Sequence, residues 1–294
     1  VDTAPMQAQF EDLLQKVKTE LNRLNAGTES MLRTTYDPQG KNTDVFAYTD
    51  EKSAAILKKV EQLTSANAGA HNAIYRGAYM GDTVTDEQYA AIAAGTFDDL
   101  YIGDYWTIGS INYRIAAFDY YYNCGNINFT KHHAVIVPDT SLYNAKMNTS
   151  NVTTGGYTGS AMYKSNLAQA KTTIKAAFGS AHVLTKRELL TNAVNGNTPS
   201  GWAWFDSDVE LMNEVQAYGS VAWGEHNGNG YNVASCDVQF PLFMFDRTKL
   251  HNREDYWLRD VASATNFSYV GDGGYAGSNS ASRSLAVRPA FCIG

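Results

Sequence analysis

Residues 101–118 read YIGDYWTIGSINYRIAAF, and this stretch decides the fold class. Apolar and polar side chains alternate along residues 101–108 and again along 112–118, which is the period-two pattern of β-strands. Gly109 and Ser110 stand between the two halves, where a tight turn would close a hairpin. The stretch therefore predicts an antiparallel β-hairpin, and the helical patterns on both sides of it predict an α+β protein.

Further strands are expected on the C-terminal side of this hairpin. Residues 133–138 form an apolar run that Pro138 ends. Residues 256–259 and 284–288 predict two more strands near the end of the sequence. The segment between them, residues 260–283, consists mainly of Ser, Ala, Gly, Asn, Asp and aromatic residues. This composition predicts turns and exposed surface.

Helices are expected between these strands. The apolar spacing predicts an amphipathic helix over residues 166–178 and others over 185–194 and 207–218. Thr185 and Glu188 have the spacing of a capping box, which supports the second of these helices. Strands and helices do not alternate regularly, and this argues against a parallel, doubly wound sheet.

The N-terminal part of the chain reads as helical from residue 6 to about residue 76, with a break at residues 34–40. A short helix is expected to begin at residues 85–88. A spacing of three and four residues recurs in two stretches: Phe10, Leu14, Val17, Leu21 and Leu24, and then Ser53, Ile56, Val60, Leu63, Asn67, Ala70 and Ile74, of which Ser53 and Asn67 are polar. A homo-oligomeric stalk and a two-helix hairpin packed on the domain both fit this spacing. We therefore expect a helical anchoring or oligomerisation segment over residues 1–97 and an α+β domain over residues 98–294.

Composition narrows the classes of function. The 294 residues include 19 Tyr and 24 Gly, 18% are charged, and the net charge is −7. Because no run of Lys or Arg forms a basic stripe, nucleic-acid binding is not expected. No apolar run approaches the roughly 20 residues needed to span a bilayer, so membrane insertion is not expected either. Tyr, Asn, Ser and Gly are typical of adaptable binding surfaces, although a β-rich fold with many turns has the same composition.

No residue pattern indicates a metal, a cofactor or a catalytic nucleophile. Cys124, Cys236 and Cys292 lie far apart and form no CxxC motif, so we expect three buried free thiols, with one disulfide and one free Cys as the alternative. His132 and His133 are adjacent, so on a strand they would face opposite sides and would not share one metal. The sequence contains no GxSxG or HExxH motif and no phosphate-binding loop.

Four carboxylates leave one enzymatic alternative open. Asp119, Asp139, Asp206 and Asp208 could supply the acid and base of a glycan-acting enzyme if two of them faced each other in a cleft. Asp206 and Asp208 precede a predicted helix, however, and N-capping is the simpler role for them. We therefore expect no catalytic residues.

The C-terminal end carries a family resemblance. Residues 257–259, WLR, and residues 287–291, VRPAF, frame the 260–283 segment. This frame resembles the end of C-type-lectin-like domains of the formylglycine-generating-enzyme subclass, which include the variable proteins of diversity-generating retroelements. Earlier segments are similar to a phage and prophage virion family that ends in this domain: residues 71–77, 97–106, 135–139, 147–148, 155–157 and 209–214.

The resemblance implies a C-type-lectin-like domain in which Trp257 and Phe291 belong to the core and Arg288 makes a buried polar contact. The enzymatic branch uses a cysteine pair that cannot be assigned here, and this favours binding over oxidation. The residues between the two frame strands would display a variable ligand-binding surface, bordered by Trp202, Trp204 or Trp223 where these are not core. The expected ligand-binding residues are Asp260, Ala262, Ser263, Asn266, Ser268, Tyr269, Asp272, Tyr275, Asn279, Ser282 and Arg283, with Tyr269 and Tyr275 as anchors.

The function that follows from the resemblance is host attachment by a phage-type virion protein. The expected partners are a host cell-surface protein or glycan, other virion proteins, and further copies of the chain in a homo-oligomer such as a trimer. A structural head-decoration or tail protein without receptor binding is the alternative, and a glycan-acting enzyme is another. The sequence does not give the ligand, the host, the position in the particle or any calcium dependence.

Overall fold

The computed structural model describes residues 12, 14–23, 52–56, 67–224 and 236–294. The chain divides into two units, residues 1–65 and residues 66–294. In the first unit residues 14–23 and 52–56 are helical, with Val17 and Ile56 exposed on them. The expected break at residues 34–40 lies outside the described residues. The role of this segment in anchoring or oligomerisation stays a prediction.

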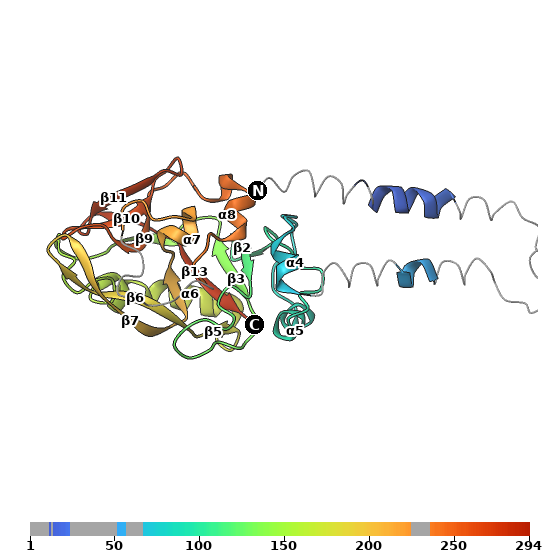
Figure 1. Ribbon diagram of the computed structural model, residues 1–294, viewed down its shortest axis with the longest axis horizontal. Helices are drawn as coiled ribbons and strands as arrows, with labels where there is room; N and C mark the ends of the chain where they lie inside the picture. Colours follow the sequence, from blue (N-terminus) through green and yellow to red (C-terminus); the bar gives the residue numbers. More distant parts are fainter. Residues whose placement is uncertain (1–11, 13, 24–51, 57–66, 225–235) are drawn as a thin grey trace, which may run out of the picture. The chain divides into compact units, whose positions relative to one another are not determined.

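The second unit combines helices with β-sheets, as the α+β prediction requires (Figure 1). It carries strands β9 to β11 and the β6–β7 ribbon at one end and helices α4 and α5 at the other. The expected helices at 85–88 and 166–178 are present as α5 and α6. The helical elements are α4 (Ala68–Asn72), α5 (Asp86–Ala94), the π-helical turn η1 (Met162–Asn166), α6 (Ala168–Phe178), α7 (Glu214–Tyr218), α8 (Pro241–Phe245) and the 3-10 turn η3 (Arg247–Lys249).

The predicted hairpin forms the edge of the first sheet. Strand order in this sheet is β1-β2-β3-β13-β5, and β8 also pairs with β13. Its strands are β1 (Tyr105–Ile108), β2 (Ile111–Phe118), β3 (Ala134–Pro138), β5 (Val183–Leu184), β8 (Val209–Leu211) and β13 (Pro289–Ile293). Gly109 and Ser110 close the β1–β2 turn with positive φ angles, as the hairpin prediction expects.

The second sheet contains most of the 260–283 segment, which lies between the two frame strands. Its order is β11-β10-β9-β12-β4, with β12 parallel to β9 and the other pairs antiparallel. The strands are β4 (Tyr143–Lys146), β9 (Tyr256–Val261), β10 (Asn266–Val270), β11 (Ala276–Ser280) and β12 (Ser284–Val287). Both frame strands predicted from the sequence are therefore present, as β9 and β12.

Arg288 lies where the chain passes from the second sheet into the first, between β12 and β13. Its buried guanidinium donates hydrogen bonds to the carbonyls of Pro138, Leu250 and Lys249 and to the hydroxyl of Tyr256, at 2.7–3.3 Å. These contacts tie both sheets and the α8–η3 segment to one side chain. The buried polar contact predicted for Arg288 is confirmed, and Trp257 and Phe291 are fully buried core residues.

The helix predicted over residues 185–194 is wrong, because this segment is strand β6 (Lys186–Asn195), paired with β7 (Thr198–Ser207). The side chains of Lys186, Glu188 and Leu190 are buried, and those of Arg187 and Leu189 between them are only partly buried. This is the alternation of a strand. Its buried positions carry charged residues, so the hydrophobic pattern did not show the period of two.

The helix predicted over residues 207–218 is also corrected. Strand β8 occupies its first part, and α7 begins only at Glu214, after an Asn213–Gln216 capping box. Asp206 and Asp208 are not N-caps, because no helix begins at them: Asp206 lies in β7 and Asp208 stands between β7 and β8. Their carboxylates form ion pairs, Asp206 with Arg187 and Asp208 with Lys171 and Lys175.

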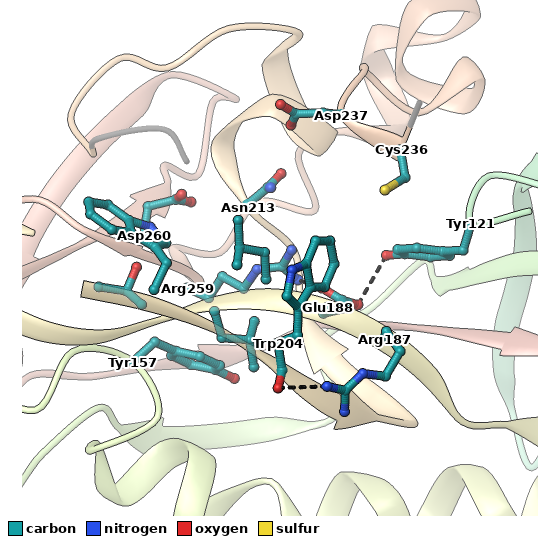
Figure 2. Close-up of a pocket in the computed structure, with 14 residues that line it drawn as sticks. Tyr121, Tyr157, Arg187, Glu188, Trp204, Asn213, Cys236, Asp237, Arg259 and Asp260 are labelled. Atoms are coloured by element: carbon teal, nitrogen blue, oxygen red, sulfur yellow. Dashed lines mark hydrogen bonds and ion pairs between the residues drawn. The ribbon is translucent and has the colours of Figure 1, made fainter. Parts of the chain in front are cut away.

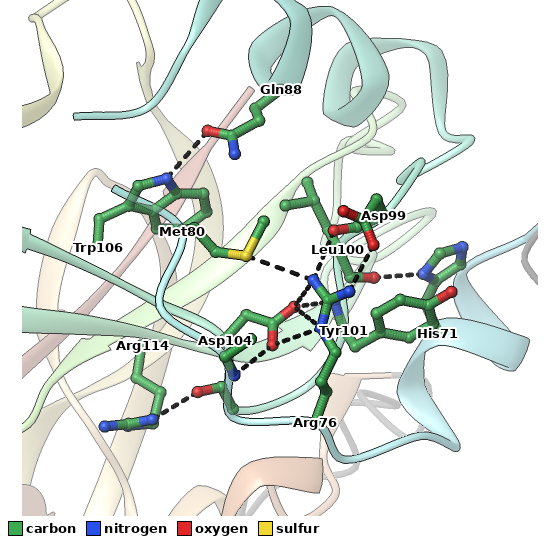
Figure 3. A network of polar contacts seen from close by, with 12 residues as sticks. His71, Arg76, Met80, Gln88, Asp99, Leu100, Tyr101, Asp104, Trp106 and Arg114 are labelled. Carbon is green, nitrogen blue, oxygen red and sulfur yellow. Dashed lines mark hydrogen bonds and ion pairs between the residues drawn. The ribbon is translucent and has the colours of Figure 1, made fainter. Parts of the chain in front are cut away.

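The expected domain boundary at residue 97 is too late, because the second unit begins at Ala66. Arg76 shows why: its guanidinium pairs with the buried carboxylate of Asp104, which also accepts the backbone N–H groups of Ala78 and Tyr101 (Figure 3). Tyr75 forms a parallel β-bridge with Ile102. The residues around Arg76 are therefore part of the sheet-containing unit.

Candidate functional site

Within the 260–283 segment, residues 266–280 fold as a β-hairpin at the edge of the second sheet. Strand β10 pairs with β11 from Asn266–Ser280 at one end to Val270–Ala276 at the other, and β11 is the edge strand. A turn at residues 271–275 joins the two strands. At about 3.3 Å per residue, the hairpin is roughly 13 Å long between these two end pairs.

The structure does not bring the eleven predicted ligand-binding residues together at one place. Asp272 and Tyr275 are exposed at the turn end, with the half-buried Tyr269 beside them. Ser263 and Asn266 lie at the opposite end. There the 262–265 segment is held by Thr153, which bonds the carbonyls of Ser263 and Ala264. Five more of the predicted residues also lie outside the 271–275 turn. They are the exposed Arg283 and the half-buried Asp260, Ala262, Asn279 and Ser282.

Ser268 does not belong to the surface, and its assignment as a ligand-binding residue is wrong. Its side chain is fully buried in β10. The pairing of β10 with β9 shifts register between Phe267 and Tyr269, which breaks the simple alternation of inward and outward side chains. A sequence pattern of period two cannot show such a bulge.

The two predicted tyrosine anchors contact each other at the turn end. Their rings meet edge to face with centroids 6.1 Å apart, and their hydroxyls are 3.3 Å apart. Each ring lies against a glycine: a Cβ on Gly277 would come within 2.5 Å of Tyr269, and one on Gly271 within 2.3 Å of Tyr275. These glycines leave room for the rings, so the hairpin backbone supports both tyrosines.

Trp223 extends this aromatic patch. Its side chain is 53% exposed, similar to the 54% of Tyr275, and its indole N–H donates to the carbonyl of Ala276 at 3.1 Å. The sequence suggested Trp223 as one possible border residue but could not distinguish it from the core. We define the aromatic patch as Trp223, Tyr269 and Tyr275.

A buried carboxylate positions the loop that carries Trp223. Both oxygens of Glu214, at the start of α7, accept backbone hydrogen bonds from Ala222, Trp223 and Gly224 at 2.8–3.1 Å. The N–H of Glu214 itself donates to the carboxylate of Asp260 at 2.7 Å. Asp260, one of the predicted site residues, is thus only partly exposed, and it supports the patch indirectly by holding the residue that binds the Trp223 loop.

Replacing Glu214 with glutamine is expected to loosen this loop. The substitution keeps the shape but replaces one acceptor oxygen by an NH2 donor facing N–H groups, at a cost of about 1.5–3 kcal/mol. Hydrogen exchange should show faster exchange of the amides of residues 222–224. Glu254→Gln, at an exposed position, is the control. Equal exchange of these amides in both variants and the wild type would contradict the positioning role of Glu214.

A polar pocket opens on the other side of Asp260 (Figure 2). Its volume is about 60 Å³, enough for a few water molecules. Trp202 and Trp204 line it from β7, and the Arg187 guanidinium donates to the Trp204 carbonyl. The lining residues are Tyr121, Tyr157, Arg187, Glu188, Leu189, Leu190, Thr191, Trp202, Trp204, Asn213, Cys236, Asp237, Arg259 and Asp260.

The floor of this pocket is a buried charge cluster. The Glu188 carboxylate pairs with Lys186 at 2.8 Å and with Arg259, and accepts a hydrogen bond from Tyr121 at 3.1 Å. Burial would raise the pKa of Glu188, but the charges of Arg259 and Lys186 outweigh it and lower that pKa. Burial and the charge of Glu188 raise the pKa of the neighbouring Glu210. The cluster therefore shifts the pKa values of its two glutamic acids in opposite directions.

Each of the carboxylates considered for glycan hydrolysis has a side-chain partner. Asp139 pairs with Arg114 at 2.5 Å, and a carboxylate oxygen of Asp119 lies 2.7 Å from Nδ1 of His132. Asp206 and Asp208 pair with the residues of β6 and α6 described above. Within the described residues no group of three or more His, Cys, Asp or Glu side chains is arranged to hold a metal ion.

Comparison of the chain with protein-family models, with curated proteins and with solved structures finds no match. Among the helices in the described part of the chain, none has the length and apolar character needed to cross a bilayer.

Proposed function

We propose that this chain is a recognition protein of a phage-type particle and that it attaches the particle to a host cell through the aromatic patch. The observation that carries the proposal is the patch itself: two large aromatic side chains, Trp223 and Tyr275, are more than half exposed on rigidly supported backbone. Aromatic side chains dominate recognition energies at protein surfaces. The resemblance of the Trp257–Arg259 and Val287–Phe291 frame to retroelement variable proteins supports the same reading.

The contacts that hold the aromatic patch in place favour a role in binding over a structural role in which the patch is only exposed. Hydrogen bonds to Glu214 and Ala276 fix the Trp223 loop, and Gly271 and Gly277 seat the tyrosine rings. A side chain that is already ordered loses less conformational entropy when it binds a partner. In a homo-oligomer, several such patches would raise the avidity for a cell surface without any new contact. The proposed partner is a host surface protein or glycan.

Replacing Trp223 and Tyr275 together with alanine is expected to lower binding to host cells by about 100-fold or more, because each anchor contributes on the order of 2 kcal/mol. Titration of labelled protein on cells of candidate bacterial hosts measures the effect. Tyr79→Ala is the matched control, since Tyr79 is 53% exposed and contacts Tyr105 and Asp82 instead of the patch.

The remaining outcomes discriminate between the alternatives. Unchanged binding by the folded double variant would overturn the patch as the contact surface. Absence of binding by the wild-type protein to every candidate host would favour a structural role in the particle. Oligomeric state is compared for all variants, because a loss of oligomers alone would lower avidity.

A further inference from the structure

A second pocket, with a volume of about 330 Å³, adjoins the turn that carries Tyr275 of the aromatic patch. Gly273 and Gly274, which precede Tyr275 in this 271–275 turn, form one of its walls. The turn is held by two backbone hydrogen bonds of 2.8 Å, from Gly274 to the Gly271 carbonyl and from Gly271 to the Tyr275 carbonyl. Small-molecule sites typically measure roughly 300–1,000 Å³, so this pocket can hold a ligand of the size of one sugar ring.

The other walls of this pocket come from two further segments of the chain. Arg247 and His251 line it from η3 and the residues after it, while Tyr218 at the end of α7 and Gln239 line it from the other segment. The imidazole of His251 lies against the glycine wall, because a Cβ on Gly274 would come within 3.4 Å of its ring. The pocket is therefore bounded by parts of the fold that are packed together.

The charge in this pocket is positive and is not used by the fold. The side chains of Arg247 and His251 form no hydrogen bond or ion pair with another residue in the described part of the chain. Among these residues no carboxylate lines the pocket. Asp246, the residue before Arg247, accepts a hydrogen bond from Tyr75 at 2.9 Å, and Asp272 lines a separate pocket. In a chain with a net charge of −7, this guanidinium is open to an anionic group.

The uncharged lining supplies further hydrogen-bonding groups. Nε2 of Gln239 donates to the Ala217 carbonyl at 2.9 Å, which leaves its side-chain oxygen as an acceptor. Tyr218 also lines the pocket, and its hydroxyl has no hydrogen-bond partner among the described residues. Polar groups that the fold leaves unpaired favour a ligand that carries many hydroxyl groups of its own.

We propose that this pocket binds a uronic acid, the carboxylate-bearing sugar of an acidic glycan, and that Arg247 pairs with the carboxylate. A guanidinium and a carboxylate form two parallel hydrogen bonds. One guanidinium matches a single negative charge better than a doubly charged phosphate. The amide and hydroxyl groups of the lining suit ring hydroxyls better than the methylene groups of an acidic peptide side chain. The inference rests on the proposed function, because it names the class of host ligand that the same turn would contact.

Ligand-observed NMR titration of the full chain with glucuronic acid and galacturonic acid tests the proposal, with glucose and galactose as neutral sugars of the same shape. At least one uronic acid should bind with a Kd of about 1 mM. The corresponding neutral sugar should bind at least about 10-fold more weakly, because it lacks the charge-assisted pair. N-acetylglutamate, which carries a carboxylate on a methylene chain, represents an acidic peptide and should also bind more weakly than the uronic acid.

Two variants locate the binding in this pocket. Arg247→Gln should weaken the binding of the uronic acid at least about 10-fold and leave the melting temperature unchanged, because the fold does not use this guanidinium. Arg253→Gln is the matched control, since Arg253 is exposed two residues beyond His251 and does not line the pocket. It should bind the uronic acid as the wild type does.

Four results would overturn the inference. They are no binding of either uronic acid, equal binding of the acid and its neutral sugar, wild-type binding by Arg247→Gln, and binding of N-acetylglutamate as tight as that of the uronic acid, which would favour an acidic peptide. The proposed function fails separately. Cell attachment through the aromatic patch without any binding of uronic acids would overturn this inference alone, whereas binding of a uronic acid by a protein that attaches to no candidate host would count against host attachment alone.

Discussion

Replacing Arg259 with methionine is expected to lower the free energy of unfolding by about 3–5 kcal/mol, because it leaves the buried Glu188 short of a positive partner. The Arg259 guanidinium pairs with Glu188 and donates to the Leu211 carbonyl at 2.9 Å. Methionine fills much of the volume but supplies neither the charge nor the donor. Loss of the Arg259 charge, which lowers the pKa of Glu188 in the wild type, would also raise that pKa.

A double-mutant cycle separates the ion pair from simple packing. Glu188→Leu alone should also be strongly destabilising, since it leaves two cations, Lys186 and Arg259, without their shared carboxylate. The Arg259→Met, Glu188→Leu double variant should be clearly more stable than the sum of the single effects predicts. Urea unfolding at neutral pH provides the free energies.

Arg283→Met is the control for this prediction, because Arg283 is exposed in the turn after β11. Its unfolding free energy should change by less than about 0.5 kcal/mol. If Arg259→Met were as mild as Arg283→Met, the buried pair would not contribute to folding and the interpretation of the cluster would be wrong.

The buried charge cluster also explains why the sequence did not predict strand β6. The hairpin at residues 101–118 was predicted because its turn and its alternation are local signals. In β6 the same alternation exists, but Lys186 and Glu188 occupy the inward positions. Glu188 can be buried there because Arg259 and Tyr121, which are distant in the sequence, form an ion pair and a hydrogen bond with its carboxylate. A local pattern cannot contain that information, and a helix was inferred instead.

Of the candidate site, too, the sequence predicted some residues and missed others. Tyr269 and Tyr275 were predicted as anchors because they lie between the frame strands, and the structure brings them together. Trp223 was not selected, since its exposure depends on the Glu214 carboxylate and on the Ala276 carbonyl. Ser268 was wrongly assigned to the surface, because the register shift beside it depends on how β10 pairs with β9 and leaves no signal in the sequence. Whether the patch binds a host ligand stays a prediction.

Lowering the pH from about 6.5 to about 4 is expected to remove about 3 kcal/mol of stability through His133 alone. Burial lowers the pKa of this histidine to about 4, compared with about 6.5 in the unfolded chain. Between these values the unfolded chain takes up a proton that the folded chain does not. The contribution of His133 is therefore complete above about pH 6.5 and decreases as the pH falls toward 4.

The hydrogen bonds of the ring explain why the neutral form is required. The backbone N–H of Tyr121 donates to Nε2 at 3.0 Å, and Nδ1 lies 2.9 Å from the Lys131 carbonyl oxygen. Nδ1 therefore carries the proton and Nε2 is the acceptor. Protonation of Nε2 would set two N–H groups against each other. Asp119 faces the ring and favours the charged form, while Lys186 and His132 oppose it.

Denaturant unfolding of wild type and His133→Gln at about pH 7 and about pH 4.5 measures this contribution. Glutamine can accept the Tyr121 N–H but does not titrate, so its loss of stability on acidification should be about 2–3 kcal/mol smaller. Glu210, whose pKa is raised, changes stability in the opposite direction as the pH falls, but it does so in both proteins and cancels in the difference. An identical pH dependence in wild type and His133→Gln would contradict the prediction, because it would mean that the buried ring accepts a proton without a loss of stability.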